Sequence, residues 1–262
     1  MEDNIVDDSI IPAAQESKRM KRTPWNDSGA KDAAIYLDVD IEVKGENMIK
    51  HDLLCFAACL GDSSTGEILD TFEVYVKPLS GSNETGWEEL CLLELWDRHE
   101  ELRKKKALIL DRITNQGVTS KEAMIALRKW ANNRPLAIRE RITVVADTNG
   151  FDIGVLNYHL ALAGMPDMYH LIDGDEKEDH PRYRPIYDTT SFNRGVGFKM
   201  PEDGDWGAED AACKQLGRAR LENPFKADHM PLNDCQSNCF DMMMIHHFIY
   251  EKKNGNHLFN SE

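Results

Sequence analysis

The 262-residue sequence lacks any long hydrophobic segment, and its basic residues are outnumbered by acidic ones. No stretch approaches the roughly 18 consecutive apolar residues that span a bilayer, and the acidic segment 1–10 has no apolar signal core. We therefore expect no membrane partner and an intracellular location, in cytoplasm or nucleus. Lys and Arg number 31 against 46 Asp and Glu, a formal net charge of −15. Taken alone, this balance argues against a nucleic-acid-binding protein.

Cysteine is also scarce, with six residues that lie in apolar or predicted helical surroundings. This pattern does not form the dense framework of a small disulfide-rich protein, so we expect reduced thiols packed as small hydrophobic side chains. Hydrophobic residues make up 41% of the chain and charged residues 29%. A chain of this length and composition can bury a sizeable core, which excludes a fibre and a wholly disordered protein.

The pattern along the chain predicts a flexible N-terminal tail over residues 1–30 and one domain over 31–255. The tail shows no hydrophobic period, and its basic run at 18–22 fits a nuclear-import signal, a phosphate-binding arm or a solvated charge cluster. Within the domain, a polar insertion at about 165–228 predicts loops and small helices. The sequence does not assign a role to the insertion.

Apolar periodicity predicts strands first and an alternation with helices afterwards. Three strands, 33–43, 53–60 and 72–78, form an antiparallel meander, and shorter strands follow at 142–146 and 186–188. Helices are predicted at 87–106, 120–131, about 152–163 and 232–250. This order implies an α/β protein with a mixed β-sheet of antiparallel and parallel strands flanked by α-helices.

The net charge conceals a basic region. Residues 98–141 contain 12 Lys and Arg against 5 Asp and Glu. The run Lys104-Lys105-Lys106 within it is either a solvated helix face or a contact for a nucleic-acid backbone. Trp87, at a predicted helix start, is either a packing anchor or a stacking platform for a base.

The first predicted strand carries Asp38, Asp40 and Glu42 at alternate positions, so their side chains point to one side. Three carboxylates in an apolar strand repel one another and are costly to desolvate, unless a cation neutralises them. Oxygen ligands of this kind favour Mg²⁺ or Mn²⁺ over zinc.

Two more acids, Asp152 and Asp234, lie in the first turns of predicted helices and are placed to point back at the strand ends. His229 precedes Asp234 by five residues, where it can act on a water molecule near the metal. Two cations held by four carboxylates can activate water and stabilise the leaving oxygen of a phosphodiester.

Other candidates have simpler explanations. Asp38 is a ligand only in a shifted register, and Asp147 and Asp188 fit turn acids better than metal ligands. A less favoured zinc site would use four residues near the C-terminus: Cys235, Cys239, His246 and His247.

The segment Asp40-Ile41-Glu42-Val43-Lys44-Gly45 resembles the D-I-E-x-x-G first motif of the DEDDh 3′→5′ exonucleases, a DnaQ-like branch of the RNase H-like superfamily. Asn149-Gly150-Phe151-Asp152 resembles their second motif, and His229 to Asp234 resembles the third, H-x4-D. Met230 stands where the other branch has a tyrosine. The resemblance covers roughly residues 33–250.

The resemblance implies a single RNase H-like domain acting as a metal-dependent 3′→5′ exonuclease that releases nucleoside 5′-monophosphates from DNA or RNA. It implies His229 as the general base and two Mg²⁺ or Mn²⁺ ions on four ligands: Asp40, Glu42, Asp152 and Asp234. The substrate contacts would be Val43, Asn149 and Phe151. The implied partner is nucleic acid with a free 3′ end, preferably single-stranded.

Two alternatives remain at this point. One is a catalytically inactive module that binds nucleic acid or protein on the same fold. The other is an acidic regulatory protein whose motif match is accidental. The sequence does not distinguish DNA from RNA, proofreading from decay, or one oligomeric state from another, because these depend on loop shape and on contacts to the sugar.

Overall fold

A computed structural model describes residues 34–81, 83, 85–147, 150–172, 186–188, 213–217 and 221–254. The predicted tail with its basic run at 18–22, the candidate Asn149 and most of the insertion at 165–228 lie outside the described residues. The division into tail and domain therefore stays a prediction. Among the described residues, no helix is long and apolar enough to cross a membrane.

A five-stranded mixed sheet forms the centre of the fold, in the order β3-β2-β1-β4-β5. Central β1 (Ile35–Val43) pairs antiparallel with β2 (Leu53–Asp62), which pairs antiparallel with β3 (Glu67–Tyr75). On its other side β1 pairs parallel with β4 (Ile142–Ala146), and β4 with β5 (Ile186–Asp188). The predicted mixed sheet of a meander plus parallel strands is thereby confirmed.

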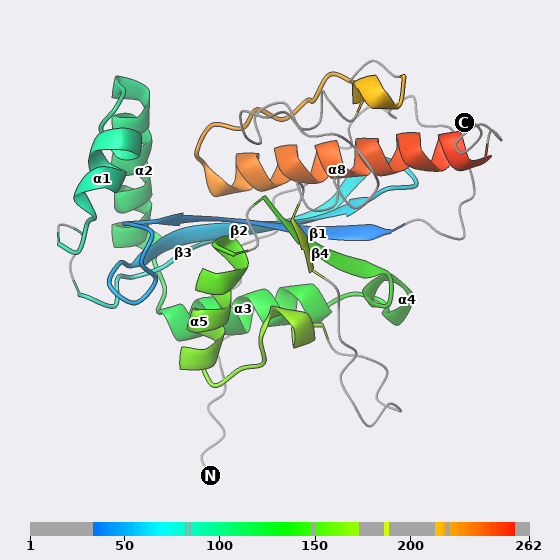
Figure 1. The fold of residues 1–262 in the computed structure, drawn as a ribbon. Helices are drawn as coiled ribbons and strands as arrows, with labels where there is room; N and C mark the ends of the chain where they lie inside the picture. The colour runs from blue at the N-terminus through cyan, green and yellow to red at the C-terminus, as the bar shows by residue number, and fades with distance from the viewer. Residues whose placement is uncertain are drawn as a thin grey trace, which may run out of the picture.

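Helices cover both faces of the sheet (Figure 1). α8 (Pro231–Asn254) lies along one face, and α3 (Ser120–Asn132) and α5 (Asp152–Leu162) lie against the other. Gly61 of β2 permits the close approach of α8, since a Cβ atom there would lie 2.5 Å from the Met243 sulfur. Short helices occur at α4 (Leu136–Arg139) and in a 3₁₀ turn (Met168–His170). All six cysteines are free, as predicted.

The prediction of one continuous helix over 87–106 is wrong. The segment instead forms α1 (Glu89–Cys91), a π-helical turn (Leu92–Trp96) and, after a break, α2 (Glu100–Gln116). Trp96 explains the break, because its fully buried side chain packs in a cluster with residues of β2 and β3 and its Nε1 donates to the Val43 carbonyl at 3.4 Å. Leu90 and Leu93 consequently stay 61% exposed. A local helical pattern does not reveal such a tertiary anchor.

The third strand begins five residues earlier than predicted, at Glu67 rather than Phe72. Its first half lies at the sheet edge with mixed exposure, so it lacks the apolar alternation that marks a half-buried strand. By contrast, α3 starts at Ser120, as predicted from the sequence. Thr119 and Glu122 form a reciprocal capping box at its first turn.

Candidate active site

Strand β1 presents its three carboxylates to the face that α8 covers. Asp38, Asp40 and Glu42 each lie opposite a small residue of β2, namely Cys59, Ala57 and Cys55. Asp40 and Glu42 line a cavity, whereas Asp38 does not and is completely buried. A register shift after Glu42 marks a β-bulge that ends the regular alternation at this point.

Helix starts supply two further carboxylates. Asp152 is the first residue of α5, which follows the central parallel strand β4, and Asp234 lies in the first turn of α8. Both side chains line the same cavity as Asp40 and Glu42. Acidic side chains are favoured at these positions because helix N-termini carry partial positive charge.

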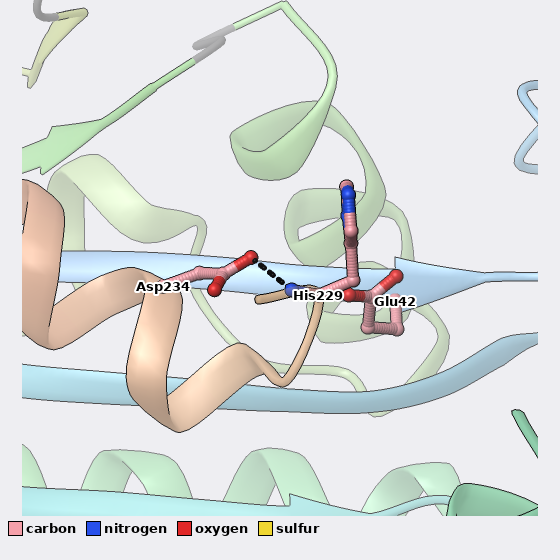
Figure 2. A group of neighbouring side chains, drawn as sticks. All are labelled: Glu42, His229 and Asp234. Atoms are coloured by element: carbon pink, nitrogen blue, oxygen red, sulfur yellow. Dashed lines mark hydrogen bonds between the residues drawn. The ribbon is translucent and has the colours of Figure 1, made fainter. Parts of the chain in front are cut away.

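The turn that enters α8 is fastened by the Asp234 carboxylate. Its two oxygens accept the backbone N–H groups of Asp228, at 2.6 Å, and of His229, at 3.0 Å; Figure 2 shows the second bond. His229 adopts a left-handed φ of 59°, an uncommon conformation for a residue with a side chain. The Asp234 carboxylate thus fixes the backbone from which the histidine ring projects.

Glu42, His229 and Asp234 together could hold a metal ion. One potential ligand atom from each lies within 4.8 Å of the others, and among the described residues no other group of three or more such side chains meets this condition. Figure 2 shows Glu42 on β1 beside the turn that carries the other two residues. The less favoured zinc site near the C-terminus is not among the groups that meet this condition in the described part of the chain, and the hydroxyl of Tyr36 pairs with the His246 ring.

The cavity has a volume of about 740 Å³ and is strongly acidic. Eight of its sixteen lining residues are Asp or Glu, and none is Lys or Arg. The four acids beyond the predicted ligands are Glu46, Glu88, Glu94 and Asp147. Glu88 and Glu94 could not be found from the sequence, because they belong to a segment that carries no motif and meet the site only in the folded chain. Glu46 directly follows the first motif but is not part of its pattern.

Burial and mutual repulsion make these carboxylates hard to ionise. Burial raises the pKa of Asp40 well above its ordinary value, and its negative neighbours, Glu42 first, raise it further. Burial likewise raises the pKa of Glu42, with Asp234 the foremost repelling neighbour. Burial also raises the pKa values of Asp38 and Asp234. A bound cation would relieve this repulsion.

We expect the metal-free protein to lose stability through these carboxylates as the pH rises. In unfolded chains Asp and Glu titrate near pH 4, and the raised pKa values of Asp40 and Glu42 keep protons bound in the folded state above that pH. The folded state then holds more protons, so stability falls as the pH rises from about 4 through the folded-state pKa values. His159 opposes this trend between about pH 4 and about 6.5, because burial lowers its pKa to about 4.

Denaturant unfolding in EDTA at several pH values tests this expectation by comparing wild type with Asp40→Asn. The contribution of His159 is common to both proteins and cancels in the difference. The wild type should lose stability more steeply with rising pH, by at most about 1.4 kcal/mol per pH unit for each extra proton. If the free energy of unfolding changed with pH equally in the two proteins, the expected repulsion would be contradicted.

A buried ion pair lies next to the cavity lining, between the lining residues Val43 and Gly45 of the chain. Lys44 is completely buried, and its Nζ lies 3.0 Å from Oδ2 of Asp52 and 2.7 Å from the Thr85 carbonyl oxygen. The Lys44 carbonyl accepts the Glu88 N–H at 2.9 Å. The next residue must be glycine, since a Cβ at Gly45 would lie 2.5 Å from the Glu88 Cβ. The glycine of the first motif therefore permits Glu88 to reach the cavity.

The remaining predicted site residues have mixed outcomes. Val43 and Phe151 line the cavity, while Asn149 lies outside the described residues. Asp147, predicted as a turn acid, also lines the cavity, and the side chain of Asp188 is not described. The Trp87 ring faces two ammonium groups, those of Lys44 and Lys106, at 5.7 and 5.5 Å from its centroid.

The basic region at 98–141 is less available than its charge suggests. At least six of its twelve cations form ion pairs with acids: Lys104, Lys105, Lys106, Arg112, Arg134 and Arg141. Within the lysine run, 72% of the Lys104 side chain is exposed, against 22% for Lys105 and 20% for Lys106. The run is therefore not a uniform basic face for a nucleic-acid backbone.

The mixed sheet, with helices on both faces, defines an RNase H-like fold of the kind found in exonucleases. No protein-family model matches the chain, and no curated protein sequence matches it either.

Solved structures of exonuclease I share this fold. A structure described as suggesting how exonuclease I achieves processivity matches with a TM-score of 0.51 and 14% sequence identity, over 85% of this chain and 42% of that one. The zinc-bound E. coli exonuclease I–ssDNA complex matches with a TM-score of 0.50, 13% identity and coverages of 85% and 42%. E. coli exonuclease I in complex with a 5cy-dA13 oligonucleotide matches with a TM-score of 0.50 and 15% sequence identity, over 83% of this chain and 42% of that one. The chain thus spans less than half the length of these exonucleases.

Proposed function

We propose that the protein is a metal-dependent 3′→5′ exonuclease that hydrolyses phosphodiester bonds of DNA or RNA and releases nucleoside 5′-monophosphates. One observation carries the proposal: four carboxylates from β1, α5 and α8 line one cavity together with His229. The shared fold with exonuclease I and the order of the three motifs along the chain also support it.

Four carboxylates, Asp40, Glu42, Asp152 and Asp234, would hold two Mg²⁺ or Mn²⁺ ions. The donor set fits such ions, because the carboxylates are hard oxygen ligands that repel one another, and none of the described lining residues is Lys or Arg. Lys105, outside the lining, only partly offsets the repulsion that raises the pKa of Glu42. When bound, the ions lower the pKa of a water molecule and stabilise the charge that develops on the leaving oxygen.

His229 would take the proton from the attacking water. Its ring is solvent-accessible at the cavity, so the proton can pass on to bulk water afterwards. The bonds that the backbone N–H groups of Asp228 and His229 donate to Asp234 fix the backbone from which the ring projects. In the balanced reaction the water oxygen bonds to phosphorus, the bond from phosphorus to the 3′ oxygen of the preceding nucleotide breaks, and that oxygen gains a proton.

The substrate would be nucleic acid with a free 3′ end, preferably single-stranded. A volume of about 740 Å³ suits a terminal nucleotide better than a duplex. Val43 and Phe151 supply apolar surface for such a nucleotide, with Asn149 as a further proposed contact. The E. coli exonuclease I structures hold single-stranded DNA or an oligonucleotide. Phosphate groups would enter so acidic a cavity only when cations are present.

The direct test incubates the full chain with single-stranded DNA and RNA oligonucleotides in Mg²⁺, Mn²⁺ or EDTA. With a 5′ label we expect a ladder that shortens from the 3′ end, with a 3′ label we expect immediate release of a mononucleotide, and in EDTA we expect neither. Binding of intact oligonucleotides without cleavage in either metal would support the inactive binding module instead. Cleavage that starts at the 5′ end would overturn the proposed direction.

His229→Ala is expected to lower kcat by about 10²- to 10⁴-fold, the usual contribution of a general base. Affinity for Mn²⁺, measured by calorimetry without substrate, should change little. The control is His99→Ala, which removes an exposed histidine that precedes α2 and makes no side-chain capping bond. A parallel loss of Mn²⁺ affinity would instead make His229 a metal ligand, a role that its distance to Glu42 and Asp234 allows.

A further inference from the structure

Lys105, on α2, connects a helix outside all three motifs to the turn that enters α8. Its Nζ lies 3.0 Å from Oδ2 of Asp228 and also donates to the Asp228 main-chain carbonyl. Only 22% of the Lys105 side chain is exposed. The ammonium group therefore holds both the side chain and the backbone of a single residue in the turn.

Asp228 passes this constraint to the candidate active site. Its second carboxylate oxygen accepts the Asn233 side-chain amide at 2.9 Å, and its N–H donates to Asp234 at 2.6 Å. The adjacent N–H, that of His229, donates to the other Asp234 oxygen at 3.0 Å. A continuous series of bonds thus runs from Lys105 through Asp228 to both site residues of the turn.

The turn needs such a constraint because His229 has a left-handed backbone, which is unfavourable for a residue other than glycine and persists only where contacts enforce it. Lys105 is not among the residues that line the cavity, and its ammonium group already contacts two oxygens of Asp228. These contacts favour a role within the protein over a direct contact to a substrate phosphate.

We propose that Lys105 is a positioning residue, which holds the 228–234 turn so that His229 and Asp234 face the carboxylates of β1. The kinetic part of this inference rests on the proposed nuclease function. The structural part, namely the order of the turn and its affinity for a divalent cation, does not depend on that function.

The test compares three variants of the full chain. Lys105→Met removes the charge and keeps most of the aliphatic stem, and Lys105→Arg restores a cation. Lys104→Met is the matched control, because Lys104 is the adjacent residue, 72% exposed and paired with Glu100 on the same helix. Amide hydrogen exchange of Asp228 and His229 is measured by NMR without metal or substrate, Mn²⁺ affinity by calorimetry, and kcat and KM on a labelled oligonucleotide.

For Lys105→Met we expect the two amides to exchange at least about tenfold faster. Mn²⁺ should also bind more weakly. Loss of the Lys105 charge, which lowers the pKa of Glu42, would by itself strengthen cation binding, so weaker binding reports a displaced turn. We expect kcat to fall by about ten- to a hundredfold with little change in KM, as for a small displacement of a reacting group. Lys105→Arg should recover most of each effect, and Lys104→Met should match wild type. If Lys105→Met does not fold, Asp228→Asn tests the same contact.

Unchanged amide exchange in Lys105→Met would overturn the inference. A raised KM with unaltered kcat would also overturn it, by identifying Lys105 as a substrate contact. If wild type cleaves no nucleic acid, the proposed function fails, whereas amide exchange and Mn²⁺ affinity still decide the role of Lys105.

Discussion

Asp40→Asn is expected to abolish hydrolysis and, at the same time, to stabilise the metal-free protein. Asp40 is repelled by Glu42, Asp152 and Asp234, which line the same cavity. Losing this proposed ligand should reduce kcat/KM by about a thousandfold or more, equal to about 4 kcal/mol of transition-state stabilisation. Relief of the repulsion should add about 1 kcal/mol to the free energy of unfolding at neutral pH in EDTA.

Both effects are measurable on one protein preparation. Cleavage is followed on a labelled oligonucleotide, and stability by denaturant unfolding with and without Mn²⁺. If the proposed site binds Mn²⁺ only in the folded state, wild type should gain stability from the ion and the variant should gain much less. Asp111→Asn, which replaces an exposed acid on α2, is the control. A variant that is inactive yet less stable than wild type in EDTA would show that Asp40 supports the fold and would remove the repulsion argument.

Lys44→Met is expected to give the largest loss of stability, about 3 kcal/mol or more. The substitution leaves the Asp52 carboxylate in a buried site without its cation, and removing one partner of a buried ion pair typically costs about 3–5 kcal/mol. Asp52 retains two hydrogen bonds from Ser80, which places the expected value at the lower end of that range. The Thr85 carbonyl also loses its donor.

Denaturant unfolding measures this loss, with Lys104→Met as the control. Lys104 forms an exposed pair with Glu100 four residues earlier, and such pairs contribute only about 0.3–0.5 kcal/mol. The double variant Lys44→Met/Asp52→Asn should be less destabilised than the sum of its single variants, because the two changes remove one shared interaction. Full additivity would mean that the pair contributes nothing beyond its separate contacts.

Much of the β1 strand could be predicted from the sequence. The alternation of Asp38, Asp40 and Glu42 within a run of apolar, β-branched residues indicates both a buried strand and a shared side for the acids. The structure has this strand at Ile35–Val43, buried on both faces, and Asp38 and Glu42 are buried on the face that α8 covers. The period of a strand is a local property, so it can be recognised without knowing what packs against it.

Other features could not be predicted in this way. Trp96 interrupts a helical pattern because it is anchored under the end of β1, and nothing near it in the sequence indicates that anchor. Lys105 and Lys106 resemble part of a basic surface until their partners, Asp228 and Asp97, are known. Glu88 has no motif around it, and it reaches the cavity because Gly45 leaves room for it.

By itself, the sequence determined the order of strands and helices and the shared side of the three acids of β1, and it proposed which acids bind metal. These follow from periodicity and residue chemistry, which act over a few neighbouring positions. Only the tertiary structure decided that Asp152, His229 and Asp234 line one cavity with β1, and that at least half of the cations at 98–141 are held in ion pairs. Those outcomes depend on contacts between segments far apart in the chain, which form only when the sheet and its helices pack together.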